Sequence, residues 1–266
     1  MIGGVEQQEL TPGRTLVESG ELVAGTMART AAGLLFDDGS ARVRLDAELA
    51  AWLRRTATAA DTDLPAPVSP RGRCRAGAAL AFAAELSVTR AGAGRTVRTD
   101  GFLVPGPGGR APADEIGEAV VLAARDTVEE WRVRHLGYLL AEAAVSPDLD
   151  AAVVSRGLRL ATALTGRQLV LLAAVARRDR SPLPITPVPR DPRDWAAWGA
   201  LEELTELQRD GLLDPPPATP RPGGAALPRL RPADLRLTRR GVLVHRLLAL
   251  DFVRDAAVSA ALADLG

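Results

Sequence analysis

Apolar side chains recur at intervals of three and four residues through most of the chain, in blocks separated by stretches rich in proline and glycine. Such spacing places the apolar residues on one face of an α-helix. The pattern predicts a mainly α fold, with a helical bundle-like body and at most a short β-hairpin near 214–238. The predicted helices cover about 14–36, 42–60, 74–91, 113–145, 148–163, 166–178, 193–211 and 239–263.

The longest predicted helix covers 113–145 and carries a continuous apolar stripe. Because an α-helix rises ~1.5 Å per residue, an unbroken helix here would be about 50 Å long. Gly117 and Gly137 are the positions at which we expect it to bend. The stripe consists of Ile116, Val120, Ala124, Val128, Trp131, His135 and Tyr138.

Chemical signals mark where several helices start. Thr165 is followed three residues later by Gln168, which is typical of a capping box. Thr238 fits the role of a second N-cap, and Asp191 followed by Pro192 matches a cap with proline at the first helical position. These signals predict the boundaries of the C-terminal helices.

One proline- and glycine-rich stretch, 92–112, contains a local anchor. Asp100 and Gly101 are typical of a turn, and Phe102 and Leu103 follow them directly. We therefore expect this loop to be pinned to the helical core by the two apolar side chains.

Small residues form a stripe in the N-terminal stretch 14–36. Ala24, Ala28 and Ala32 recur every four residues, a spacing that lets another helix approach closely. Packing within the chain and self-association both explain the stripe. A third interpretation is that 14–36 acts on membranes, although Arg29 interrupts the apolar run.

Composition excludes several classes of protein. Hydrophobic residues make up 47% of the chain and aromatic residues 3%, which favours a helical core of Leu, Ala and Val. All basic residues are arginine, typical of a GC-rich bacterial genome, so Schiff-base and P-loop lysines are excluded. The single Cys74 excludes an intramolecular disulfide and fits a reducing cytoplasm.

No apolar run approaches the ~20 residues of a membrane span, and the start lacks the charge pattern of a signal peptide.

Catalytic and metal-binding patterns are missing from the sequence. His135 lies on the apolar stripe, so we expect a core histidine, whereas we expect His245 near the surface. The carboxylates of Glu115 and Glu118 share a helix face, but no Glu-x-x-His motif accompanies them. No nucleophile elbow or dinucleotide loop occurs in its required context. The sequence predicts no catalytic residue, no metal, no cofactor and no enzyme.

The C-terminal third has the order of a winged-helix-like module. A buried helix at 164–178 precedes a helix that ends in a Gly-Leu-Leu turn at 198–213, and a proline-rich excursion leads to 235–248. The middle helix carries an acidic face of Glu202, Glu203 and Glu206, which a phosphate backbone would repel. The predicted domains are an N-terminal helical segment at 1–60, a helical body at 70–163 and the winged-helix-like module at 164–266.

Arginines cluster on the presumed wing, where Asp234 is the one acid between residues 217 and 240. A local positive patch of this kind binds nucleic acid or a protein partner, or is simply solvated. The net charge of zero and the acidic middle helix weigh against nucleic acid. The candidate binding residues are Arg221, Arg229, Arg231, Arg236, Arg239 and Arg240.

These motifs together resemble a family of uncharacterised bacterial proteins. The likeness covers about 70–265 and implies a helical body followed by a winged-helix-like end, with no established activity and no catalytic residues. The matching motifs are RCRAGAALAFA (73–83), TDGF (99–102), Glu115 with Glu118, RHLGYLLAEAA (134–144), LTGRQLVLLA (164–173) and LQRDGLL…LRLT (207–238).

We therefore expect a non-enzymatic cytoplasmic interaction or scaffold protein that acts through its winged-helix-like end. The expected partner is a protein or a second copy of the chain, without a stable membrane span. The alternative is a weak DNA-associated regulator that uses the arginine-rich wing. A membrane-active helical effector acting through 14–36 is the third hypothesis.

Overall fold

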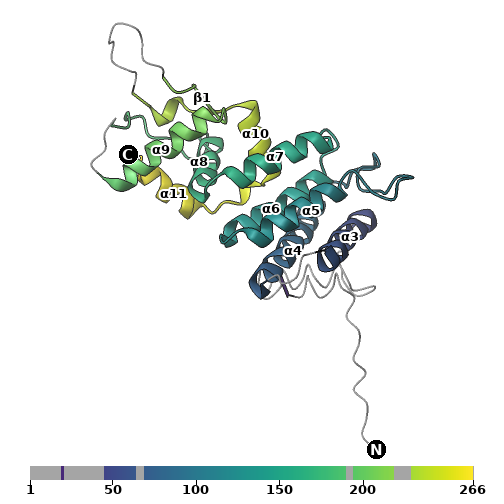
Figure 1. Cartoon of the computed structure of the whole chain (residues 1–266). Helices are drawn as coiled ribbons and strands as arrows, with labels where there is room; N and C mark the ends of the chain where they lie inside the picture. The colour runs from purple at the N-terminus through teal and green to yellow at the C-terminus, as the bar shows by residue number, and fades with distance from the viewer. Residues whose placement is uncertain (1–18, 21–44, 64–68, 190–193, 219–228, 266) are drawn as a thin grey trace, which may run out of the picture. The chain divides into compact units, whose positions relative to one another are not determined.

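The computed structural model describes residues 19–20, 45–63, 69–189, 194–218 and 229–265. Within these ranges the chain forms nine α-helices and one antiparallel pair of short strands, which confirms the predicted mainly α fold (Figure 1). The helices are α3 (Ala47–Asp63), α4 (Pro70–Gly92), α5 (Asp114–Asp126), α6 (Glu130–Ala144), α7 (Ala151–Ala163), α8 (Gly166–Ala176), α9 (Trp195–Arg209), α10 (Arg239–Leu247) and α11 (Asp255–Ala263). The strands are β1 (Leu213–Asp214) and β2 (Arg236–Leu237).

The chain divides into two compact units, Met1–Leu158 and Arg159–Gly266. The division falls within α7, whereas the sequence places the start of the C-terminal module at 164. Of the predicted N-terminal segment 1–60, only residues 19–20 and 45–60 are described. The alanine stripe at 24–32 therefore lies outside the described residues.

In the first unit, α4 packs against both α5 and α6, and glycines permit the close contacts. A Cβ at Gly137 of α6 would overlap with the carbonyl oxygen of Ala79 in α4. A Cβ at Gly20 would also overlap with the backbone of α4, at Gly77 and Ala78. The sequence analysis expected the helix to bend at Gly137. In the structure, Gly137 instead allows α6 to pack closely on α4.

The predicted continuous helix over 113–145 is wrong, because the chain breaks between α5 and α6. Thr127 has an extended backbone, and its Oγ1 accepts a hydrogen bond from the N–H of Glu129 at 3.2 Å. This local bond competes with the helical ladder, as threonine hydroxyls do. Val128, predicted on the apolar stripe, is 81% exposed at the break.

Arginines fix the long loop between α4 and α5 to the C-terminal end of α6. The buried Arg98 donates from Nη1 to the carbonyl oxygens of Ser146 at 3.1 Å and Leu149 at 2.7 Å. Phe102 and Leu103 are also buried, after a turn at which Gly101 has φ +80°, so the predicted anchoring of this loop is confirmed.

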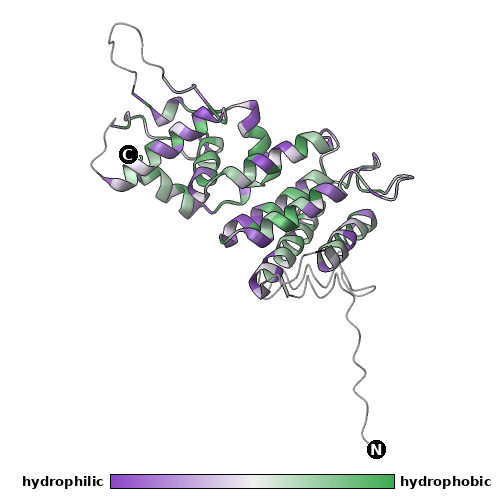
Figure 2. Cartoon of the chain, in the orientation of Figure 1, coloured by the Kyte–Doolittle hydropathy of each residue, from purple (hydrophilic) through white to green (hydrophobic). Residues whose placement is uncertain are grey.

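In the second unit, α8 is the central element and contacts α9, α10, α11 and β2. Its apolar run is largely buried and appears green in Figure 2. The capping box of Thr165 and Gln168 is present, and Thr238 caps α10 through a bond from the N–H of Gly241, so both predicted caps are confirmed. The strand pair joins Leu213 to Leu237.

One predicted helix in this unit is wrong, and one predicted helix cap cannot be compared with the structure. The predicted helix at 239–263 is wrong, because it is divided into α10, a short 3₁₀ turn at Leu250–Phe252 and α11, with Ala249 at φ 46°. The reason is tertiary: the guanidinium of Arg177 bonds three carbonyl oxygens of the turn and the carboxylate of Asp255. Asp194 caps α9, while the predicted cap Asp191 lies outside the described residues.

In the part of the chain that the structure describes, no single helix is long and apolar enough to cross a membrane. The pair α7 and α8 reaches the required length and hydropathy together, but the two helices are bent by 118° at their junction.

Replacing Gly137 by alanine should destabilise the first unit. The new methyl group overlaps with a backbone carbonyl oxygen that has no freedom to move, so α4 and α6 must separate. Overpacking of this kind costs about 1–3 kcal/mol, which urea denaturation would measure. Gly92→Ala is the matched control, since a Cβ there meets nothing within 4 Å. Equal stability of the two variants would contradict the close packing of α6 on α4.

Candidate functional site

The predicted arginine cluster is only partly available for binding. Arg229, Arg231, Arg239 and Arg240 are exposed. Arg236 is also exposed, but its Nη1 donates to the carbonyl oxygens of Ala233 and Leu235, both at 2.7 Å. Arg221 lies outside the described residues. Four arginines with free guanidinium groups therefore remain in the described part of the wing.

Arg239 and Arg240 occupy the first turn of α10. The N-terminal end of a helix carries a partial positive charge, which disfavours cations there. Within the described residues neither side chain has a hydrogen bond or an ion pair that would offset this repulsion. The two arginines therefore form a small basic site that no anion among the described residues neutralises.

The predicted acidic face of α9 is exposed at Glu202 and Glu206, but two of its three carboxylates also accept hydrogen bonds from the start of α8. Glu203 is half-buried and accepts a hydrogen bond from Thr165 Oγ1 at 3.0 Å. Glu206 accepts one from Gln168 Nε2 at 2.8 Å. Both carboxylates thus lie at the positive N-terminal end of α8, where anions are stabilised. Glu202 and Glu206 are both exposed, and within the described residues Glu202 has no bonded partner.

The outward face of α9 carries an aromatic pair that the sequence analysis did not single out. Trp195 is 81% exposed and Trp198 is 43% exposed. Their ring centroids are 5.8 Å apart, and the ring planes are nearly perpendicular at 82°. The signal in the sequence was their spacing of three residues behind the Asp194 cap, which places both indoles on one helix face.

Arg167 explains why these indoles point outward. Its Nη2 donates to the carbonyl oxygen of Ala196 at 2.8 Å and to Asp264 at 2.6 Å. A Cβ at Gly199 would lie 3.3 Å from Arg167 Nη1, so the absence of a side chain there gives the guanidinium room. The first turn of α9 is thereby held against the C-terminal residues with its other side in solvent.

The two histidines have different surroundings. His135 is buried, and its ring lies between those of Trp131 and Tyr138, with centroids 6.5 and 5.8 Å away, so the predicted core position is confirmed. His245 is half-buried, and its Nε2 is enclosed without a hydrogen-bond partner in the described part of the chain. Burial lowers the pKa of His245 from 6.5, with Arg177 acting in the same direction and Asp251 opposing it.

Neither a metal site nor a catalytic pocket emerges from the described residues. They contain no group of three or more His, Cys, Asp or Glu side chains arranged to hold a metal ion. Glu118 instead pairs with Arg110 at 2.7 Å.

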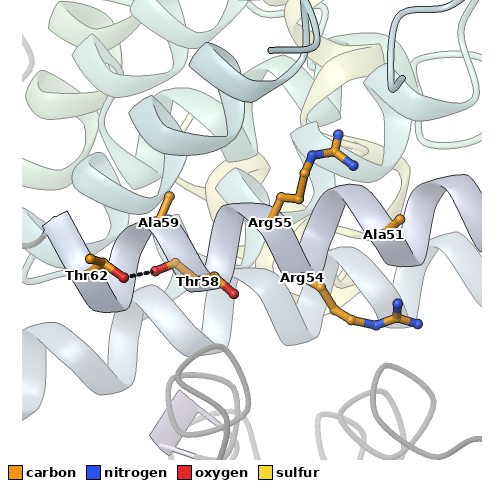
Figure 3. A pocket seen from close by; sticks show the side chains of 6 residues that line it. All are labelled: Ala51, Arg54, Arg55, Thr58, Ala59 and Thr62. Carbon is orange, nitrogen blue, oxygen red and sulfur yellow. Dashed lines mark hydrogen bonds between the residues drawn. The ribbon is translucent and has the colours of Figure 1, made fainter. Parts of the chain in front are cut away.

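A shallow pocket follows one face of α3 (Figure 3). Arg55 is held there by the carbonyl oxygen of Leu103 at 2.7 Å and by Asp114 at 3.2 Å. The residues that line this pocket include two threonine hydroxyl groups but no histidine or carboxylate that would act as a general base. The lining residues are Ala51, Arg54, Arg55, Thr58, Ala59 and Thr62.

Comparisons with known proteins found no match: no family model, no curated protein and no solved structure matches this chain. The resemblance inferred from the motifs therefore stays a prediction, and the surfaces described above carry the functional argument.

Acidification should destabilise the second unit through His245. Because burial lowers its folded-state pKa below 6.5, the unfolded chain binds a proton first as the pH falls. Stability is therefore complete above pH 6.5 and decreases below it, until the folded form also titrates. His245→Gln should reduce the loss of melting temperature between about pH 7.5 and 5.5, because glutamine does not titrate. An identical loss in both proteins would show that His245 is not the titrating group.

Proposed function

We propose that this protein is a non-enzymatic interaction protein that binds a protein partner through its second unit. The observation that carries the proposal is the exposed pair of Trp195 and Trp198 on α9. Tryptophan is among the residues that contribute most to binding at protein interfaces, because its large rigid ring loses little entropy when it is covered. A cytoplasmic location, predicted from the sequence, fits this role.

The order of elements around the tryptophans supports a winged-helix-like module. The extended stretch after α8 pairs with the chain before β2, through bonds from Val188 N to Leu230 O at 2.9 Å and from Ala233 N to Pro184 O at 3.1 Å. Helix α9, β1, β2 and α10 follow along the chain in the order that the sequence analysis associates with such a module. Within this proposal α9 occupies the position of the recognition helix.

The side chains of α9 favour a protein over DNA as the partner. A helix that reads bases in the major groove presents mainly arginine, asparagine or glutamine to them. The outward face of α9 instead presents Trp195, Trp198 and Glu202. Apolar rings with an adjacent carboxylate suit a protein surface and oppose a phosphate backbone.

Site-directed photo-crosslinking tests this proposal. A benzoylphenylalanine in place of Thr205, which follows Trp198 by two turns, should give a discrete protein adduct in cells. The adduct should be lost when Trp195 and Trp198 are both alanine, because the anchoring rings are gone. It should persist when the exposed Ile185 and Val242 are both alanine, which removes a comparable apolar surface elsewhere. An adduct that still forms when both tryptophans are alanine would reject the proposed surface.

Weak nucleic-acid binding by the wing is the second candidate function. It is favoured by Arg239 and Arg240, two exposed cations at the positive end of α10 without a described intramolecular anion. Glu203 is half-buried and bonded to Thr165, which removes part of the repulsion expected from the sequence. Contacts of this kind reach phosphates and carry no sequence information.

If the wing binds nucleic acid, Arg239→Gln with Arg240→Gln should reduce the salt dependence of duplex binding. Each phosphate contact contributes about 0.9 to the slope of log affinity against log salt, so the slope should fall by roughly 2. The charge-matched control is Arg71→Gln with Arg156→Gln, both exposed in the first unit. Fluorescence anisotropy with a labelled duplex at several salt concentrations measures the slopes. Equal slopes in the two double variants would exclude a specific role of the wing.

A further inference from the structure

We infer that the Trp195–Trp198 surface binds the proline-rich segment 215–222 of a second copy of this chain. The inference rests on the proposed function and names the partner of that surface. Proline-rich segments adopt an extended helix without internal hydrogen bonds and dock on exposed aromatic rings. The chain carries both parts of such a contact, the ring pair on α9 and the sequence PPPATPRP directly after β1.

The geometry of the ring pair suits a proline ligand. The two indole rings are nearly perpendicular, and their centroids are 5.8 Å apart. In the proposed contact, a pyrrolidine ring packs against the exposed ring surfaces of this pair. An indole N–H is a hydrogen-bond donor only. Proline has a carbonyl acceptor and no N–H, so a proline-rich backbone matches these donors. Because each proline ring fixes φ, a proline-rich ligand also loses less conformational entropy on binding.

The charges of the two partners are complementary. Residues 194–206 contain Asp194, Glu202, Glu203 and Glu206 and no basic residue. Residues 215–233 contain three arginines and no acidic residue. Asp194 and Glu202 are exposed on either side of the tryptophans in the sequence, which places carboxylates beside the docking surface. Arg221 lies between two prolines of the segment and supplies the matching cation.

The anchoring of the segment favours exchange between copies. Gln208, in the last turn of α9, donates from Nε2 to the carbonyl oxygen of Pro215 at 2.5 Å. Leu230, after the segment, is bonded to Val188. The start of the segment is therefore anchored at the last turn of α9, whereas the tryptophans lie in its first turn. Pro215 and Pro216 are themselves exposed and accessible to another copy. In the proposed dimer, the tryptophan pair of each copy binds the proline-rich segment of the other copy. Such a reciprocal exchange gives a dimer with twofold symmetry.

The test is the association state of the full chain, measured by sedimentation at several concentrations. The wild type should dimerise. Trp195→Ala with Trp198→Ala should raise the dimer dissociation constant by roughly 30-fold or more, as expected for interface hot spots. Replacement of Pro216, Pro217 and Pro220 by alanine should weaken the dimer in the same direction. Ile185→Ala with Val242→Ala is the control, and it should leave the dimer unchanged.

Mixing the two defective variants tests the exchange itself. The tryptophan-deficient copy keeps its proline segment, and the proline-deficient copy keeps its tryptophans, so one intact contact remains in the mixed dimer. The mixture should associate at a concentration at which each variant alone is monomeric. A mixture that stays monomeric there would overturn reciprocal docking.

Other outcomes separate this inference from the proposed function. A monomeric wild type whose Thr205 crosslinks to a different protein would overturn the inference and leave the proposed function standing. Binding of the synthetic peptide 214–222 by a chain that stays monomeric would assign the surface to a foreign proline-rich partner and also overturn it. Tryptophan-dependent binding to phospholipid vesicles, without dimerisation, would reject both proposals.

Discussion

The first unit depends on the buried guanidinium of Arg98. A helix ends with carbonyl groups that have no partner within the helix, and a buried cation is costly unless it is fully hydrogen-bonded. Arg98 resolves both problems at the end of α6, because its backbone N–H donates to the carbonyl oxygen of Ala144 at 2.9 Å. Its guanidinium donates to the carbonyl oxygens of Ala143, Ser146 and Leu149 and pairs with Asp100. Its guanidinium also lies 3.9 Å from the centre of the Phe102 ring. A loop without regular structure is thereby joined to the helical core, and α5 follows directly from that loop.

The same use of arginine recurs in the second unit, where Arg177 holds the turn between α10 and α11 and Arg167 holds the start of α9. A planar guanidinium spreads five donors over three nitrogen atoms and reaches carbonyl groups that lie apart, whereas the three donors of lysine share one nitrogen atom. The lysine-free composition therefore has a structural consequence beyond the reactions it excludes. It also divides the arginines of the wing, since Arg236 bonds neighbouring carbonyls while Arg239 and Arg240 have no described partner.

Local chemistry was predictable from the sequence, and contacts between distant residues were not. Thr165 with Gln168 and Thr238 act within one helical turn, so their spacing alone predicted the caps. The break near Ala249 depends on Arg177, more than seventy residues earlier in the chain, and no glycine or proline marks it. For the site, the exposure of Arg239 and Arg240 agreed with the sequence pattern. The hydrogen bonds of Glu203 and Glu206 to the start of α8 were not predictable, because they depend on how α9 rotates against α8.

That rotation also determines what α9 presents to solvent. Glu203 and Glu206 hydrogen-bond to the N-terminal end of α8, while Trp195 and Trp198 are exposed in the first turn of α9. The core does not need these rings, because it is built from leucine and alanine and encloses Trp52 instead. An indole left in water contributes little to folding, since the free energy of apolar burial is gained only when surface is removed from water. Two indoles placed together on the exposed face of one helix, in a chain with 3% aromatic residues, therefore favour a surface whose burial occurs on association.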